Sequence, residues 1–296
     1  MKKASILHLI TTAKNASPFD VNMAIDAGFD YLIPYTNVLV DEVVALTQDA
    51  IFSRSPDGIK REAIFFGGRD IHFALKMQQL SKEAMFEPFS FSTFSDPSGA
   101  FTTAAAMLAK VNQLQAIKNQ TIAIFGATGP VGLTSAMIAM AQGAKVQLVA
   151  HRDLESVQVH ADVLQSRYGC SVQVVDGASD AAKTKVLQSA TIAISAAAAG
   201  VRVLDYPQFI QSESLKVMAD VNAVAPSGIA GVEAKSDGVK IGDTQILGVG
   251  ALAIGQLKYT TQHKLLQQLL SVDKPVHLAY NDAYQFACDN IAHKHA

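Results

Sequence analysis

Three glycines at GxxGxxG spacing follow a short apolar run, and they are the residues best suited to chemistry in this chain. The run 121–125 is rich in strand-favouring residues and ends at Gly126, with Gly129 and Gly132 following at intervals of three residues. Gly126 permits a tight turn, Gly129 lets the backbone approach a pyrophosphate, and Gly132 lets a helix pack closely against the sheet. The spacing departs from the strict GxGxxG fingerprint, but strand, turn and helix occur in the order that dinucleotide binding requires. We therefore predict a dinucleotide-binding turn rather than a plain strand-to-helix connection.

The end of the next expected strand, 145–149, indicates which dinucleotide is bound. An NAD site normally has an acidic residue here, about 20 residues beyond the glycines, to bind the ribose 2′-OH. In this chain His151 and Arg152 follow the strand, and the planar guanidinium of Arg152 matches a 2′-phosphate. The alternative is a solvated loop charge, and Asp153 keeps NAD open. The residues favour NADP, with NAD accepted as well.

Other residues at expected strand ends complete the predicted cofactor site. Pro130 suits the first turn of the helix, where its missing N–H has no intrahelical use. The small residues of 195–200 either let a flat ring approach the backbone or simply pack closely in a turn. The full set of expected cofactor-binding residues is Gly126, Thr128, Gly129, Pro130, Val131, His151, Arg152, Ser195, Ala196, Asp220, Asn222 and Gly250.

No acid–base or metal motif stands out. The sequence has no HExxH, no clustered Cys and His residues and no GxSxG elbow, so no metal site is expected. Lys258 is expected on the first turn of a helix after the glycine-rich segment 250–255, either as the charged side of that helix or as a ligand-binding group. Asp20 and Asp96 are likewise either helix caps or ligand-binding groups.

Composition excludes several classes of protein. The 296 residues carry a net charge of −2, with 49% hydrophobic and 17% charged residues, and no basic stripe argues for nucleic acid. Cys170 and Cys288 are isolated, which is typical of a reducing compartment. The N-terminus is interpreted as a first strand rather than a signal peptide, and no stretch is apolar enough to span a bilayer. A cytoplasmic protein without a membrane partner is expected.

Alternating strands and helices predict an α/β protein of two domains. The first, 1–103, is an α/β domain with a parallel sheet and its ligand at the carboxyl ends of the strands, and the C-terminal segment 273–296 is expected to pack back on it. The second, 104–272, is a Rossmann-type NAD(P)-binding domain, with an active-site cleft between the two. Strands are expected at 5–11, 31–35, 61–66, 89–92, 121–125, 145–149, 171–175, 191–194, 215–219 and 245–249. Helices are expected at 18–28, 40–47, 70–83, 104–115, 131–142, 153–168, 181–189, 256–270 and 282–292.

Six segments together resemble one family, the NAD(P)-dependent methylenetetrahydromethanopterin dehydrogenases of methylotrophic bacteria. They are SPFDVNMAIDAGF (17–29), LTQDAIFSR (46–54), DPSGAFTTAAAM (96–107), IFGATGPVG (124–132), DVNAVAPSGIAG (220–231) and GVGALAIGQLKYTTQ (248–262). The resemblance implies hydride transfer from 5,10-methylene-tetrahydromethanopterin to NAD(P)+, which gives the methenyl cation, as a step of one-carbon (formaldehyde) oxidation. It also implies a homo-oligomer.

This implied chemistry accounts for the missing acid–base motif. The methylene carbon lies between two nitrogens, whose lone pairs can expel the hydride, so no proton is removed from that carbon and no general base is needed. The family pattern implies a pterin site of Phe19, Asp20, Asp96, Ser98, Thr102, Thr103 and Lys258. Within it Asp20 and Lys258 are the implied catalytic residues: Asp20 holds the amidine-like edge of the pterin, and Lys258 polarises or orients the carrier.

The sequence leaves three alternatives open. A methylene-tetrahydrofolate dehydrogenase is the neighbouring function, but those enzymes often hydrolyse the methenyl product with a lysine/tyrosine arrangement that we do not find, so we predict no cyclohydrolase activity. A dehydrogenase of the shikimate-dehydrogenase type, acting on a hydroxy acid, is the second. A non-catalytic NADP-binding regulator is the third.

Overall fold

The computed structural model describes residues 3–294, which form two compact units. Unit 1 comprises the described residues up to Thr102 together with Tyr259–Ala283, and unit 2 comprises Thr103–Lys258 and the described residues from Tyr284 onward. Met1, Lys2, His295 and Ala296, which the expected domain ranges include, lie outside the described residues.

The unit boundaries fall inside three helices, α5 (Ala100–Leu114), α10 (Ala251–Ser271) and α11 (Tyr280–Lys294). The sequence pattern predicts 104–272 as one domain and assigns 273–296 to the other. The observed units instead divide α10 after Lys258 and α11 after Ala283. Helical periodicity continues through these positions, so the sequence pattern gives no sign of the change of unit.

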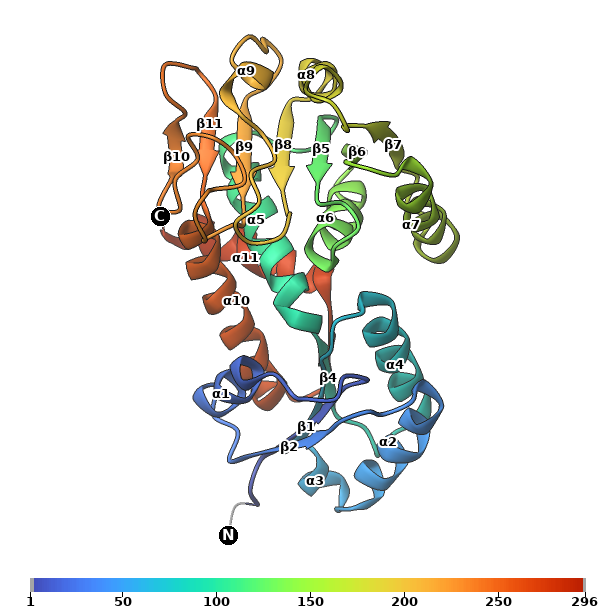
Figure 1. The fold of residues 1–296 in the computed structure, drawn as a ribbon. Coiled ribbons are helices and arrows are strands. Elements are labelled where there is room, and N and C mark those ends of the chain that lie inside the picture. Colours follow the sequence, from blue (N-terminus) through green and yellow to red (C-terminus); the bar gives the residue numbers. More distant parts are fainter. Residues whose placement is uncertain (1–2, 295–296) are drawn as a thin grey trace. The chain divides into compact units, whose positions relative to one another are not determined.

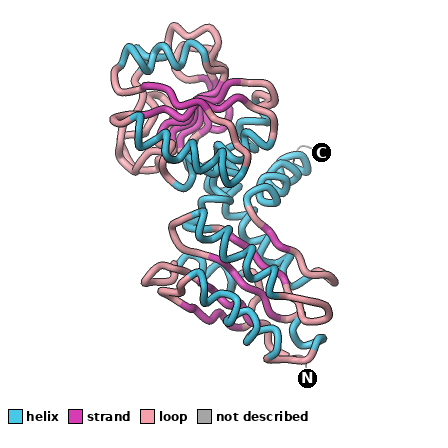
Figure 2. The backbone as a smooth tube through the Cα atoms, turned by 90° about the vertical axis from the view of Figure 1, so that its right-hand side faces the viewer, coloured by secondary structure: helices cyan, strands magenta, loops and turns pink. Residues whose placement is uncertain are grey.

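Unit 1 is built on a parallel sheet (Figures 1 and 2). Its five strands lie in the order β12-β4-β3-β1-β2. Its strands are β1 (Ile6–Ile10), β2 (Tyr31–Tyr35), β3 (Glu62–Phe66), β4 (Ser92–Ser95) and β12 (His277–Leu278). Its helices, besides parts of α5, α10 and α11, are α1 (Pro18–Asp26), η1 (Val40–Glu42), α2 (Val43–Phe52), α3 (Pro56–Ile59), α4 (Ile71–Ala84) and η2 (Pro97–Gly99). Every residue of the central strand β3 is buried.

The short strand expected at 89–92 is wrong in position, because β4 begins at Ser92. All four residues of β4 are buried between β3 and β12, but three of them are Ser or Thr, so the strand has neither an apolar run nor an alternation of apolar and polar residues. The alternation at 89–92 instead belongs to a turn in which Phe86 and Phe89 form an isolated bridge.

Unit 2 contains a sheet of seven strands in the order β10-β11-β9-β8-β5-β6-β7, parallel except for β10, which runs antiparallel to β11. Its strands are β5 (Thr121–Phe125), β6 (Lys145–Ala150), β7 (Gln173–Asp176), β8 (Ile192–Ser195), β9 (Val217–Asp220), β10 (Asp237–Lys240) and β11 (Leu247–Val249). Its remaining helices are α6 (Pro130–Ala141), α7 (Leu154–Tyr168), α8 (Asp180–Ser189) and α9 (Tyr206–Phe209). The chain runs from β5 outward through β6 and β7, then returns to β8 on the other side of β5. This reversal is the topological switch point at which Rossmann folds bind dinucleotides, so the predicted α/β class with a Rossmann-type unit is confirmed.

Four short elements have no clear sequence signal, namely α3, α9, β10 and β12. Two long helices begin earlier than expected, α5 at Ala100 and α10 at Ala251. Lys258 therefore lies on the third turn of α10 and not on its first, which corrects the expected position.

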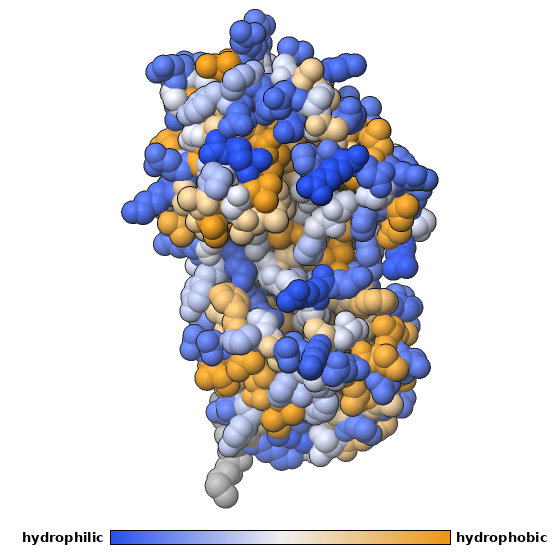
Figure 3. Space-filling view, viewed as in Figure 1, coloured by the Kyte–Doolittle hydropathy of each residue, from blue (hydrophilic) through white to orange (hydrophobic). Residues whose placement is uncertain are grey.

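None of the helices within residues 3–294 is both long enough and apolar enough to cross a membrane. On the face drawn in Figure 3, hydrophobic residues form separate small groups among hydrophilic ones. Nor does the described part of the chain contain a group of His, Cys, Asp and Glu side chains arranged to hold a metal ion.

Candidate functional site

Gly126 and Gly132 are required by packing at the switch point of unit 2. Gly126 has φ +75°, and a Cβ added to it would lie 2.5 Å from the carbonyl carbon of Ala196, because β8 ends beside β5. The Ala196 N–H donates to the Phe125 carbonyl over 2.9 Å, which fixes the two strand ends together. A Cβ on Gly132 would overlap the Gly126 carbonyl oxygen, so glycine there lets α6 sit against the turn.

Gly129 is different, because no contact with residues 3–294 requires it to be glycine. Its φ is −76°, and an added Cβ would make ordinary contacts of 3.4 Å and 3.9 Å with the carbonyl oxygens of Gly126 and Ala196. Gly129 is the N-cap of the 12-residue helix α6 and has no side chain to cap the N–H groups of the first turn. The missing side chain therefore leaves those N–H groups open to an approaching phosphate.

The turn itself is accessible, unlike the elements that it joins. Thr128 is exposed, while Gly126, Gly129, Pro130 and Val131 are half-buried. By contrast, four of the five residues of β5 and most of α6 are buried. The structure thus places all five predicted turn residues on one exposed edge at the carboxyl end of β5.

At the end of β6, Arg152 offers an exposed positive charge to a ligand. His151, Arg152 and Asp153 are all exposed. The Asp153 carboxylate caps α7, accepting from the N–H groups of Glu155 at 3.0 Å and Ser156 at 3.2 Å. Asp153, the acidic residue that left NAD as an alternative cofactor, is therefore engaged as a helix cap. This favours a contact between Arg152 and a 2′-phosphate.

Asp220 and Asn222 are turned into the loop that follows β9. The buried Asp220 carboxylate accepts from three backbone N–H groups, those of Asn222 at 3.1 Å, Gly228 at 2.6 Å and Ile229 at 3.2 Å. Asn222 accepts from the N–H groups of Gly200 and Val224 and donates to the Pro226 carbonyl. Both side chains organise the rim of the switch point.

Burial raises the pKa of the Asp220 carboxyl, although the three backbone N–H groups act in the opposite direction. Ser195 at the end of β8 is also fully buried, and a Cβ on Gly228 would lie 2.6 Å from its hydroxyl oxygen and 2.7 Å from Asp220 Oδ1. Close packing likewise explains Gly250, where a Cβ would overlap the Glu233 carbonyl oxygen.

We expect Asp220→Asn to destabilise unit 2 by about 2 kcal/mol, because the amide nitrogen cannot accept a hydrogen bond from the backbone. The N–H groups of Gly228 and Ile229 share Asp220 Oδ2 and that of Asn222 uses Oδ1, so either amide orientation leaves buried donors unsatisfied. Urea denaturation followed by circular dichroism measures the change. Asp153→Asn is the matched control, since asparagine also caps helices. An unfolding free energy equal to that of the wild type in Asp220→Asn would contradict the assigned role.

In unit 1, the candidate residues lie close to the carboxyl ends of the strands. Asp96 follows β4 and is fully buried, and its carboxylate accepts from the N–H groups of Phe101 at 2.9 Å and Thr102 at 3.2 Å and from the Thr102 hydroxyl at 2.6 Å. Asp96 and Thr102 are thus brought together at the start of α5. Ser98 is exposed, has φ +54° and donates its hydroxyl to the Gly68 carbonyl over 2.8 Å.

Asp20 is not a helix cap, because Ser17 caps α1 by accepting from the Asp20 N–H. The Asp20 side chain is only 5% exposed and receives a hydrogen bond from Gln262 on α10, a residue that the sequence did not single out. Phe19 beside it is 45% exposed. Thr103 and Lys258 belong to unit 2 and are half-buried.

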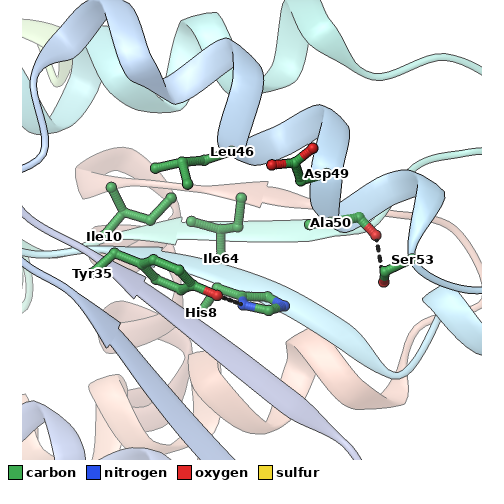
Figure 4. Close-up of a pocket in the computed structure, with 8 residues that line it drawn as sticks. All are labelled: His8, Ile10, Tyr35, Leu46, Asp49, Ala50, Ser53 and Ile64. Atoms are coloured by element: carbon green, nitrogen blue, oxygen red, sulfur yellow. Dashed lines mark hydrogen bonds between the residues drawn. The ribbon is translucent and has the colours of Figure 1, made fainter.

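A second polar cluster lies in unit 1 under α2 (Figure 4). His8 Nδ1 lies 3.2 Å from the Tyr35 hydroxyl and His8 Nε2 lies 3.1 Å from Glu62, which also pairs with Arg54 at 2.7 Å. Burial, together with the negative charges of Glu62 and Asp49, raises the pKa of Tyr35. His8, Tyr35 and Asp49 line a cavity of about 200 Å³. The members of the cluster come from four elements, so no local pattern in the sequence reveals it.

Comparison with known proteins connects both units to one family. Residues 18–98 match the family model described as methylene-tetrahydromethanopterin dehydrogenase, N-terminal. The chain is 43% identical over 96% of its length to the NAD(P)-dependent methylenetetrahydromethanopterin dehydrogenase of Methylorubrum extorquens, of which it covers 98%. It is 31% identical over 92% of its length to the Bifunctional protein MdtA of the same organism, covering 94% of it.

Among solved structures, the ornithine carbamoyltransferase of Pyrococcus furiosus superposes with a TM-score of 0.52 at 12% identity, covering 92% of this chain and 87% of that one. A likeness at this identity concerns the fold alone.

Proposed function

Because this chain belongs to the NAD(P)-dependent methylenetetrahydromethanopterin dehydrogenase family, we propose that it transfers a hydride from 5,10-methylene-tetrahydromethanopterin to NAD(P)+. The product is the methenyl cation of the carrier, formed in the oxidation of formaldehyde-derived one-carbon units. The observation that carries the proposal is the 43% identity to a dehydrogenase of this name along 96% of the chain, through both units. Formation of NAD(P)H from methylene-tetrahydromethanopterin by the purified protein tests it.

The residues of unit 2 fit a nicotinamide dinucleotide. Gly129 leaves the first turn of α6 open to a pyrophosphate, and the Gly126 turn lies at the switch point beside Ala196. Thr128, Pro130 and Val131 border the same turn, while Ser195, Asp220, Asn222 and Gly250 shape the strand ends around it. When bound, the dinucleotide supplies the nicotinamide ring that accepts the hydride.

The preferred dinucleotide in this proposal is NADP, with NAD accepted as well. Arg152 is exposed at the end of β6, and the neighbouring Asp153 carboxylate is engaged as the cap of α7. A guanidinium can donate two parallel hydrogen bonds to a phosphate. His151 lies beside it at the same strand end.

The pterin carrier is assigned to unit 1 and to the adjoining helix residues. Phe19 offers an exposed ring, and Asp20 offers a carboxylate for the amidine-like edge of the pterin. Asp96, Ser98, Thr102 and Thr103 shape the segment between β4 and α5 that borders this region. Lys258 orients the carrier.

Catalysis in this proposal depends on positioning and charge rather than on proton transfer at the reacting carbon. The two nitrogens that flank the methylene group expel the hydride and share the positive charge that develops. A carboxylate held in a buried position stabilises such a charge more strongly than it would in water, because the local dielectric constant is low. Asp20, which binds the amidine-like edge of the carrier, supplies such a negative charge to the same ring system and orients it.

Arg152→Ala is expected to raise the KM for NADP+ about tenfold, because the variant loses a charged hydrogen bond to the 2′-phosphate. The KM for NAD+ is expected to stay the same, because NAD+ has no 2′-phosphate. Initial-rate kinetics with both cofactors measure the ratio. Arg167→Ala, at another exposed arginine of unit 2, is the matched control. If both KM values changed equally, Arg152 would not be the 2′-phosphate ligand.

The proposal extends to three further properties. The methenyl product is not hydrolysed by this protein, so its absorbance is expected to persist in the presence of enzyme as it does in buffer alone. The protein works in the cytoplasm. It assembles as a homo-oligomer, which light scattering of the purified protein can test.

A further inference from the structure

A buried hydrogen bond links α1 and α10 within unit 1. Gln262 is fully buried, and its Nε2 atom donates to Asp20 Oδ1 over 3.1 Å. The Asp20 backbone N–H is satisfied separately by Ser17 Oγ. The amide of Gln262 therefore acts on the Asp20 carboxylate itself and not on the helix terminus.

The second carboxylate oxygen points to the edge of the sheet where ligands bind. Asp20 Oδ2 lies 3.9 Å from the position that a Cβ on Gly67 would occupy. Gly67 directly follows β3, the central strand, and its N–H donates to the Ile10 carbonyl at the end of β1. Ligands of open parallel sheets bind outside the carboxyl ends of the strands. Gln262 thus holds one oxygen of Asp20, and the other lies at that edge, beside a residue without a side chain.

An amide at position 262 suits this task better than a cation would. A Lys or Arg side chain there would cancel part of the negative charge of the carboxylate. A neutral N–H donor orients the carboxylate without adding a charge of its own. The proposed reaction develops a positive charge on the carrier, so an oriented, charged carboxylate is what the transition state requires.

We propose that Gln262 is a positioning residue for hydride transfer, which fixes the Asp20 carboxylate through its Oδ1 atom. This inference rests on the proposed function, because it gives Asp20 its task. Gln262 is the last residue of the resembling segment 248–262, but the proposed pterin site does not include it.

Two variants of Gln262 test it. Gln262→Met keeps the length of the side chain and removes the donor, so kcat is expected to fall about tenfold while the KM for NADP+ stays the same. Gln262→Glu places two carboxyl groups together, which raises the pKa of one of them. When the introduced carboxyl group is protonated it donates to Asp20 as the amide does, so this variant is expected to be active in mildly acidic buffer and to lose activity as pH rises. The wild type should show no such alkaline loss.

The control is Gln78→Met in the same unit. Gln78 is also buried, and its Nε2 donates to Thr93 Oγ1 at 3.1 Å and to the Leu278 carbonyl at 2.8 Å. Its loss is expected to lower thermal stability and to leave kcat and the pH profile unchanged. A purely structural role for Gln262 predicts the same behaviour for both glutamines.

The possible results distinguish failure of the positioning role of Gln262 from failure of the proposed function. Turnover by the wild type, with kcat and pH profile unaltered in both Gln262 variants, would overturn the inference alone. Failure of the wild type to oxidise methylene-tetrahydromethanopterin would overturn the proposed function, and the inference with it. Support requires the fall in kcat for Gln262→Met and recovery at low pH for Gln262→Glu. In an Asp20→Asn background, Gln262→Met should have no further effect, because the two residues act as one unit.

Discussion

Replacing Gly126 with alanine is expected to lower the free energy of unfolding by about 3 kcal/mol or more. Two effects add: the residue has φ +75°, and its Cβ would lie 2.5 Å from the backbone of Ala196, which is hydrogen-bonded to Phe125. Chemical denaturation measures the loss. Gly169→Ala is the matched control, because Gly169 has φ +69° with nothing within 4 Å of an added Cβ; only the backbone strain of about 1–2 kcal/mol should remain.

Gly129→Ala is expected to leave stability nearly unchanged and to weaken cofactor binding. Its added methyl group makes only ordinary contacts, so we expect stability within about 1 kcal/mol of the wild type. The Kd for NADP+, measured by isothermal titration calorimetry, should nevertheless rise about tenfold, because the methyl group occupies the space through which a pyrophosphate reaches α6. If Gly129→Ala lost stability but kept its affinity for NADP+, the pyrophosphate would not bind at the first turn of α6.

The second large effect is expected for Asp20→Asn, which should lower kcat for methylene-tetrahydromethanopterin about 100-fold. The substitution keeps the shape of the side chain and removes the charge that stabilises the developing cation. The KM for NADP+ should not change, since the cofactor is assigned to unit 2. Steady-state kinetics at saturating NADP+ measure the effect.

Asp70→Asn provides the control in the same unit. The Asp70 carboxylate caps α4 by accepting from the N–H groups of His72 and Phe73, a role that asparagine also fills. Its kcat should equal that of the wild type. An equal kcat in Asp20→Asn would exclude a charged role for Asp20 in the reaction.

The sequence predicts the centre of unit 2 well because the information there is local. The strand β5, the three glycines, α6 and β6 follow one another without interruption, and each has a strong pattern of its own. The elements without clear signal are short or lie at sheet edges, such as β10 and β12. The helices α5 and α10 begin earlier than their patterns predict, because glycine and small residues at 97–100 and 250–255 are typical of loops while tertiary packing keeps part of them helical.

The direction of polar side chains cannot be predicted in the same way. Asp153, Asp220 and Asn222 stand at strand ends where cofactor ligands are expected, yet their side chains bond to nearby backbone. For Asp20 the position near a helix start suggests a cap, but Ser17 caps α1, and the Asp20 carboxylate bonds elsewhere. Gln262 lies at the end of the resembling segment 248–262, but no local pattern indicates its role, because its partner is 242 residues away.

The most direct test of the central claim is turnover by the wild-type protein, followed through NAD(P)H absorbance. Methylene-tetrahydromethanopterin is supplied with NADP+ and with NAD+ in parallel, and methylene-tetrahydrofolate is the competing carrier. We expect rapid NADPH formation from the methanopterin carrier, slower turnover with NAD+, and less activity with the folate. Turnover with the folate alone would contradict this expectation in favour of a folate enzyme, and NADPH binding without turnover of either carrier would contradict it in favour of a different dehydrogenase or a non-catalytic protein.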